Sequence, residues 1–164
     1  MKQNIIIVIA LAMTLAWTGC SHNKKAASQS ENKKEKVDTV PSSASAEVTE
    51  LSASDFKKKV MDYEAHPQEW VYEGSRPAII DFYATWCRPC KMMSPIVEQL
   101  AKDYAGKIDF YKVDIDKEQE LAALFGIQSI PTFLLIPMQG KPTMQMGAMQ
   151  REEFEKIIKD VMGE

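Results

Sequence analysis

An apolar segment followed by two cysteines limits the fold of this chain more than any other feature. Residues 78–83, Ala-Ile-Ile-Asp-Phe-Tyr, come after Pro77 and are largely apolar, as in a strand buried on both faces of a sheet. Cys87 and Cys90 follow, separated by two residues, so that one helical turn brings their sulfurs within bonding reach. The sequence therefore predicts a buried strand that leads into a helix bearing a redox-capable pair.

The two cysteines have different expected roles. Backbone N–H groups and the positive end of the helix dipole favour a thiolate at a helix N-terminus. In Cys-X-X-Cys settings the pKa of such a thiol falls from about 8.5 to about 7 or lower. We expect Cys87 to be the exposed nucleophile. Cys90, a turn deeper and beneath Pro89, is expected to stay protonated until a mixed disulfide forms and then to resolve it.

Two structural interpretations of the pair remain open at this point. Zinc also uses cysteines at this spacing, but the only other cysteine is the distant Cys20. The histidines, His22 and His66, supply no second pair at ligand spacing, so we predict no metal and no cofactor. A purely structural disulfide is the other interpretation, although a loop this short restrains little chain entropy.

The first residues have the pattern of an export signal. Residues 1–4 give a short basic start, and residues 5–17 form an apolar stretch of signal length that is short for a transmembrane helix. The segment ending in Gly19-Cys20 resembles the bacterial lipoprotein signal, in which small residues precede the lipidated cysteine. We expect residues 1–19 to be a signal peptide of lipoprotein type and Cys20 to be the lipidation site.

Ordinary processing remains the alternative to lipidation. Trp17 occupies a position where lipoprotein signals usually have an aliphatic residue, which leaves cleavage after Gly19 by a general signal peptidase open. Residues 20–46 lack aromatic side chains and are mostly small, polar or charged, so we expect a flexible tether. Residues 47–164 are then the single folded domain.

Charge excludes one class of partner. The formal net charge is −3, and most acidic residues follow Ala46, without a basic stripe suited to nucleic acid.

An exported chain reaches a compartment in which disulfides persist, so location alone does not give the direction of electron flow.

Hydrophobic periodicity predicts an α/β fold with a central mixed β-sheet flanked by helices. Strand and helix patterns alternate through the first part of the domain, which favours parallel pairing, and the last two strands are close enough for a hairpin. The expected elements are strand 48–51, a helix capped by Ser52, strand 78–83, helix 89–104, strand 108–113, a helix capped by Asp116, strands 132–136 and 143–146, and helix 150–162.

From about Val48 to Met162 the chain resembles the thioredoxin family. Residues 81–91 are similar to the family's Asp-Phe-Trp-Ala-X-Trp-Cys-Gly-Pro-Cys-Lys, and residues 129–132, Ser-Ile-Pro-Thr, are similar to the loop whose proline is cis and faces the disulfide. The resemblance implies a thioredoxin fold and dithiol–disulfide exchange on protein substrates.

The resemblance also implies roles for single residues. Asp81 would be the buried carboxylate that accepts the proton of Cys90, with Lys112 modulating its charge, and burial would raise the pKa of Asp81. Pro131 would be cis, with the Ile130 backbone pairing to an extended substrate strand. The implied substrate groove is lined by Trp86, Ile130, Pro131, Gly147 and Ala148.

The chain departs from the family pattern at two places. Arg88 stands beside Pro89 where the family has glycine, and its charge would favour the Cys87 thiolate and make the disulfide more oxidising. Residues 62–77 enlarge the connection before the central strand and contain Trp70 and Tyr72, which we expect to pack on the core.

Together these features predict an exported, periplasmic and monomeric thioredoxin held at the membrane through the lipid on Cys20. It would reduce or isomerise disulfides in exported proteins with the Cys87/Cys90 couple and be re-reduced by a membrane electron donor. Two alternatives remain: a net oxidase that donates its disulfide, and a redox-switched binding module for unfolded chains.

Overall fold

The computed structural model describes residues 47–163. Cys20, the signal peptide expected at 1–19 and the tether expected at 20–46 lie outside the described residues, and the interpretation of these segments stays a prediction. Within residues 47–163, no helix is both long enough and apolar enough to cross a membrane.

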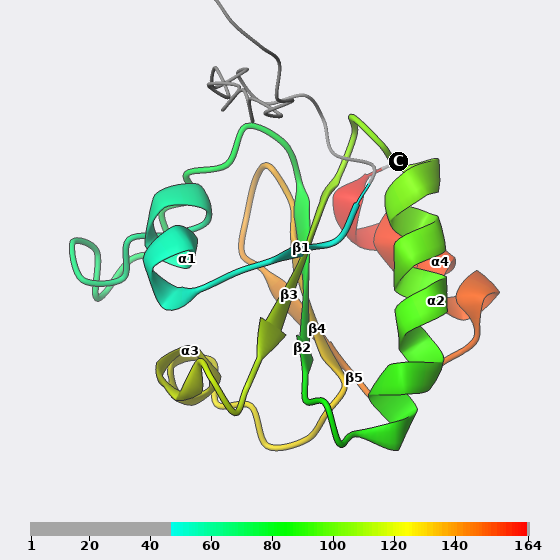
Figure 1. Ribbon diagram of the computed structural model, residues 1–164. Helices are drawn as coiled ribbons and strands as arrows, with labels where there is room; N and C mark the ends of the chain where they lie inside the picture. The colour runs from blue at the N-terminus through cyan, green and yellow to red at the C-terminus, as the bar shows by residue number, and fades with distance from the viewer. Residues whose placement is uncertain (1–46, 164) are drawn as a thin grey trace, which may run out of the picture. The chain divides into compact units, whose positions relative to one another are not determined.

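A five-stranded mixed sheet lies at the centre of the fold (Figure 1). The strand order is β1-β3-β2-β4-β5. Strands β1 and β2 both pair in parallel with β3, whereas β4 is antiparallel to β2 and β5 is antiparallel to β4. The strands are β1 (Thr49–Glu50), β2 (Ala78–Tyr83), β3 (Asp109–Asp114), β4 (Thr132–Ile136) and β5 (Thr143–Met146). The predicted mixed sheet is confirmed.

Four helices cover the two faces of this sheet in the described part of the chain. They are α1 (Ala53–Lys59), α2 (Arg88–Asp103), α3 (Gln119–Leu124) and α4 (Arg151–Met162). Helices α2 and α4 lie on one face, and α1 and α3 lie on the other (Figure 1).

Each face has its own apolar core. On the α2/α4 side the rings of Phe133 and Phe154 lie 4.5 Å apart between sheet and helix. On the α1/α3 side Phe56 and Phe82 are fully buried beside Phe125. Strand β2 is central in the sheet and contributes to both cores, because its alternate side chains point to opposite faces.

One helix start was predicted correctly and another was not. Ser52 Oγ accepts a hydrogen bond from the Asp55 N–H at 3.2 Å, so it caps α1 as expected. The prediction that Asp116 caps the next helix is wrong. Helix α3 begins later, at Gln119, with Glu118 as its N-cap and no capping bond from a side chain. Asp116 lies in the preceding turn, and its carboxylate binds a different group described below.

Residues 62–77 pack against the core, as predicted for this enlarged connection. Trp70 and Tyr72 both lie against the core on the α1/α3 side. The Trp70 ring meets Phe125 edge-on with centroids 6.4 Å apart. The connection is tied to β3 by Arg76, whose guanidinium pairs with Asp109 at 2.7 Å.

Candidate active site: a disulfide at the start of α2

The cysteine pair lies where strand β2 passes into helix α2. Cys87 is the N-cap of α2 and is bonded to Cys90, with an S–S distance of 2.02 Å and a Cα–Cα distance of 5.3 Å. The backbone N–H of Cys90 donates a hydrogen bond of 3.1 Å to Cys87 Sγ. The first turn contains Arg88 and Lys91 and no acidic residue. A negative charge on the Cys87 sulfur would therefore be stabilised by an N–H donor, the helix dipole and nearby cations.

The expectation that Cys87 is exposed is wrong for the disulfide form. Its exposed fraction is 3 %, against 2 % for Cys90. Ala84 and Ile130 pack against the two cysteines and cover them, whereas Arg88 and Pro89 are exposed. The two cysteines thus differ in their position on the helix rather than in how much of each residue is open to solvent.

The loop opposite the disulfide has the expected arrangement. The Ile130–Pro131 peptide bond is cis, and the carbonyl oxygen of Ile130 lies 3.8 Å from Cys87 Sγ. The N–H of Gly147 donates a hydrogen bond of 2.9 Å to the carbonyl of Pro131, which joins this loop to the end of β5. The structure thus brings Ile130 against the disulfide and joins Gly147 to the neighbouring Pro131, and Ala148 follows as an exposed residue.

Trp86 forms an exposed wall next to the disulfide. Its side chain is 66 % exposed, yet its indole Nε1 donates a hydrogen bond of 2.8 Å to Asp116 Oδ2. This role of Asp116 was not predicted from the sequence. The two residues are 30 positions apart, and only the parallel pairing of β2 with β3 brings their loops together.

Asp81 is buried on β2 and lines a cavity together with Ser94, whose hydroxyl donates a hydrogen bond to the Cys90 carbonyl. Asp81 is 5 % exposed and faces Lys112 on β3 in the strand register. Burial raises the pKa of Asp81 to about 7, and the charge of Lys112 opposes this shift. Among the described residues, Asp81 Oδ1 has no hydrogen-bond partner. A carboxyl group with this pKa exchanges protons readily near neutral pH.

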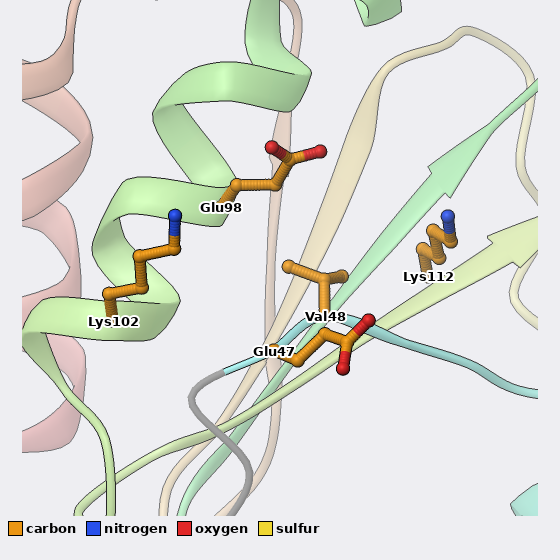
Figure 2. Close-up of a pocket in the computed structure, with 5 residues that line it drawn as sticks. All are labelled: Glu47, Val48, Glu98, Lys102 and Lys112. Atoms are coloured by element: carbon orange, nitrogen blue, oxygen red, sulfur yellow. The ribbon is translucent and has the colours of Figure 1, made fainter.

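A small cavity of about 60 Å³ reaches Asp81. Ser94 and Glu98 of α2 line it together with Lys112 of β3. An open pocket of about 480 Å³ shares three lining residues with this cavity, namely Val48, Glu98 and Lys112. In this pocket Glu98 and Lys102 project from α2 opposite Glu47 and Lys112 (Figure 2). The cavity has room for a water molecule, so a proton on Asp81 is close to solvent.

Ser94 and Glu98 were not singled out from the sequence, although their spacing contains the signal. They follow Cys90 by four and eight residues, which places all three on one face of α2. In the described residues, no group of three or more His, Cys, Asp or Glu side chains is arranged to hold a metal ion.

A cysteine pair at a helix N-terminus, above a buried carboxylate and opposite a cis-proline loop, defines a thiol–disulfide oxidoreductase. Residues 47–160 match the family model described as Thioredoxin. The chain belongs to the thioredoxin family, and with its Cys-X-X-Cys pair it is a protein-disulfide reductase.

Individual relatives agree with this assignment. The chain is 56% identical over 113 residues to a protein named Thioredoxin from Borreliella burgdorferi, covering 69% of this chain and 96% of that protein. It is 40% identical over 115 residues to chloroplastic Thioredoxin M4 of Arabidopsis thaliana, covering 70% of this chain and 54% of that protein. A crystal structure of chloroplastic thioredoxin z matches in fold, with a TM-score of 0.58 at 22% identity over 72% of this chain and 96% of that one.

Proposed function

We propose that this chain reduces or isomerises disulfides in exported proteins, with Cys87 as nucleophile, Cys90 as resolving thiol and Asp81 as proton acceptor. The observation that carries the proposal is the hydrogen bond of 3.1 Å from the Cys90 N–H to Cys87 Sγ at the start of α2. It singles out Cys87 as the sulfur on which negative charge is favoured.

The exchange proceeds in two steps that conserve electrons. In the reduced protein the Cys87 thiolate attacks one sulfur of a substrate disulfide, so a mixed disulfide forms and one substrate thiolate leaves. Cys90 then attacks Cys87 Sγ, the mixed disulfide breaks, and the second substrate thiolate leaves. The substrate gains two electrons and the Cys87–Cys90 pair loses them.

Asp81 acts in the second step. Cys90 reacts as a thiolate, so its proton must be removed when it attacks. Asp81 is the buried carboxyl group beneath the site, with an unpaired Oδ1 and a pKa raised to about 7 by burial. It accepts the proton of Cys90 and passes it on through the cavity lined by Ser94 and Glu98.

The proposed location of the protein in the cell is based on its first residues. The signal pattern in residues 1–19 supports export to the periplasm, and the lipoprotein-like segment before Cys20 supports a lipid anchor. Residues 20–46 then serve as a tether between the lipid and a monomeric domain. Cytosolic reductants do not reach that compartment, so a membrane electron donor restores the dithiol.

Turnover of a model disulfide tests the cysteine roles. With insulin as substrate and dithiothreitol as electron source, the intact protein is expected to accelerate disulfide reduction, and Cys87→Ser to abolish the acceleration. Cys90→Ser is the matched control, because it retains the nucleophile and loses only resolution. Full turnover by Cys87→Ser would contradict the proposal.

Mass spectrometry of the mature N-terminus tests the anchor. The account predicts a chain that begins at Cys20 and carries the added mass of a lipid. An unmodified chain that begins at Cys20 would instead show ordinary processing after Gly19, and an N-terminus at Met1 would contradict export by this signal.

A net oxidase is the second candidate, and Arg88 favours it. An exposed cation between the cysteines stabilises the reduced form and thus makes the disulfide a better oxidant. Equilibrium of the pair with glutathione discriminates the two. A potential near the thioredoxin value of about −270 mV supports the reductase, and one near about −120 mV supports the oxidase.

A further inference from the structure

Tyr83 stands in the active-site run where the thioredoxin motif has tryptophan, and its surroundings suggest a specific task. It is the last residue of β2 and lies two positions after Asp81, so both side chains leave the same face of the sheet. Tyr83 and Asp81 line the same small cavity together with Lys112.

The Tyr83 ring contacts the ammonium group that faces Asp81. Lys112 Nζ lies 5.7 Å from the centroid of the Tyr83 ring, within the range of about 6 Å for a cation–π interaction. Asp81 Oδ1 has no hydrogen-bond partner in the part of the chain that the structure describes, although Lys112 lies opposite Asp81 in the strand register. The ammonium is therefore on the ring and not bonded to that oxygen.

We propose that Tyr83 is a positioning residue for disulfide exchange: its ring holds the Lys112 ammonium, which leaves Asp81 Oδ1 free to accept a proton. The proposal rests on the role proposed above for Asp81. Lys112 bonded directly to Asp81 would compete with the incoming proton for the same oxygen.

Several other charged groups surround Asp81, Tyr83 and Lys112. The titratable groups that line the Asp81 cavity are Tyr83 from β2, Lys112 from β3 and Glu98 from α2. Tyr83 is also close to Glu50 and Asp114, and both of these carboxylates pair with Lys117, at 3.0 and 3.6 Å. Glu98 and Glu47 face Lys112 as well, in the open pocket beside this cavity. Lys112 is the cation that acts on Asp81, and its contact with the ring holds the ammonium away from Asp81 Oδ1.

Direct titration of Asp81 tests the proposal. The chemical shift of the Asp81 carboxyl carbon is followed by NMR as a function of pH and gives the pKa of this group. The sample is the oxidised full chain labelled with carboxyl-¹³C aspartate. Tyr83→Leu removes the ring, releases Lys112 toward Asp81 and is expected to lower the pKa by about one unit. Tyr83→Phe retains the ring and is expected to leave the pKa unchanged. An unchanged or raised pKa in Tyr83→Leu, or an equal fall in Tyr83→Phe, overturns the proposal.

Two further measurements separate positioning from a change in packing. In a Lys112→Met background, Tyr83→Leu is expected to produce no shift, and a shift that persists there overturns the proposal. The unsubstituted protein gives a test that requires no folding of a variant. Its Lys112 side-chain protons are expected to show an upfield ring-current shift, and ordinary positions for them would also overturn the proposal.

The link to exchange has its own readout. In Tyr83→Leu, the midpoint pH of insulin reduction is expected to fall by the same amount as the pKa of Asp81 measured by NMR. A lower pKa of Asp81 with an unchanged midpoint pH of activity would overturn the positioning role of Tyr83. Full activity of Asp81→Asn would instead contradict the role proposed for Asp81, and the NMR titration remains interpretable in either case.

Discussion

The indole Nε1 of Trp86 donates a hydrogen bond of 2.8 Å to the Asp116 carboxylate and so connects the active-site turn to the turn after β3. The Trp86 side chain is 66 % exposed, so the bond fixes a large apolar surface that remains open beside the disulfide. In the proposed function, this surface and the Ile130–Pro131 loop are the parts of the site that we expect a protein substrate to contact.

We expect Asp116→Ala to weaken the binding of protein substrates. Without its acceptor the Trp86 ring loses a fixed orientation, so the KM for insulin should rise about two- to fivefold, the loss typical of one exposed hydrogen bond. The kcat should change little, because the hydrogen bond of the Asp116 carboxylate at the site is with the Trp86 indole and not with a sulfur. Steady-state kinetics check this, with Asp160→Ala, an exposed acid on α4, as the matched control. Equal effects of the two substitutions would contradict the role.

Asp81 makes the stability of the oxidised protein depend on pH. Its pKa is about 7 in the folded state because of burial, far above the ordinary value of 3.8. As pH rises from about 4 to about 7, the unfolded chain ionises first, so the free energy of unfolding should fall by on the order of 4 kcal/mol and then level off.

Asp81→Asn should remove this pH dependence and slow insulin reduction. Urea denaturation at pH 4 to 8, followed by tryptophan fluorescence, measures the pH dependence of the free energy of unfolding. The change in this free energy between pH 4 and 8 should be much smaller in the variant. An equal fall in stability in Asp81→Asn and the parent protein would show that another group titrates.

Arg88→Gly should make the protein a stronger reductant. The exposed guanidinium favours the Cys87 thiolate, so its removal destabilises the reduced form and lowers the reduction potential. Solvent screens the contribution of an exposed charge to about 0.5–1 kcal/mol, which corresponds to a shift of about 10–20 mV. Equilibration with glutathione measures it, with Lys156→Ala on α4 as a control of equal charge change. A higher potential in Arg88→Gly would contradict the account.

Substitutions at Trp70 test the packing of residues 62–77. The ring packs against Phe125, so Trp70→Ala should lower the free energy of unfolding by about 2 kcal/mol. Within the described residues, its buried Nε1 has no hydrogen-bond partner, so Trp70→Phe should cost much less than the alanine variant. Urea denaturation compares the two, and equal losses would mean that the ring packing contributes nothing.

Much of this fold could be predicted because its signals are local. The run of apolar residues at 78–83 indicated a central buried strand, Ser52 indicated a helix start, and the spacing of Cys87 and Cys90 indicated a pair within one turn. Each depends on neighbours within a few residues.

The rest depends on contacts between distant segments. Asp116 looked like a helix cap because acidic residues often have that role, but the indole of Trp86 binds its carboxylate and α3 starts later. The burial of Cys87 follows from contact with Ile130, 43 residues further along the chain. No local pattern in the sequence reports such contacts.

In the proposed mechanism Cys87 attacks the substrate and Cys90 resolves the mixed disulfide, and trapping of that intermediate distinguishes the two roles. Cys90→Ser is incubated reduced with a disulfide-containing protein, quenched with acid and digested without reductant, and the linked peptides are identified by mass spectrometry. We expect a stable mixed disulfide at Cys87 and none with the reciprocal Cys87→Ser variant. A mixed disulfide that accumulates at Cys90 in Cys87→Ser, with none at Cys87 in Cys90→Ser, would contradict this mechanism.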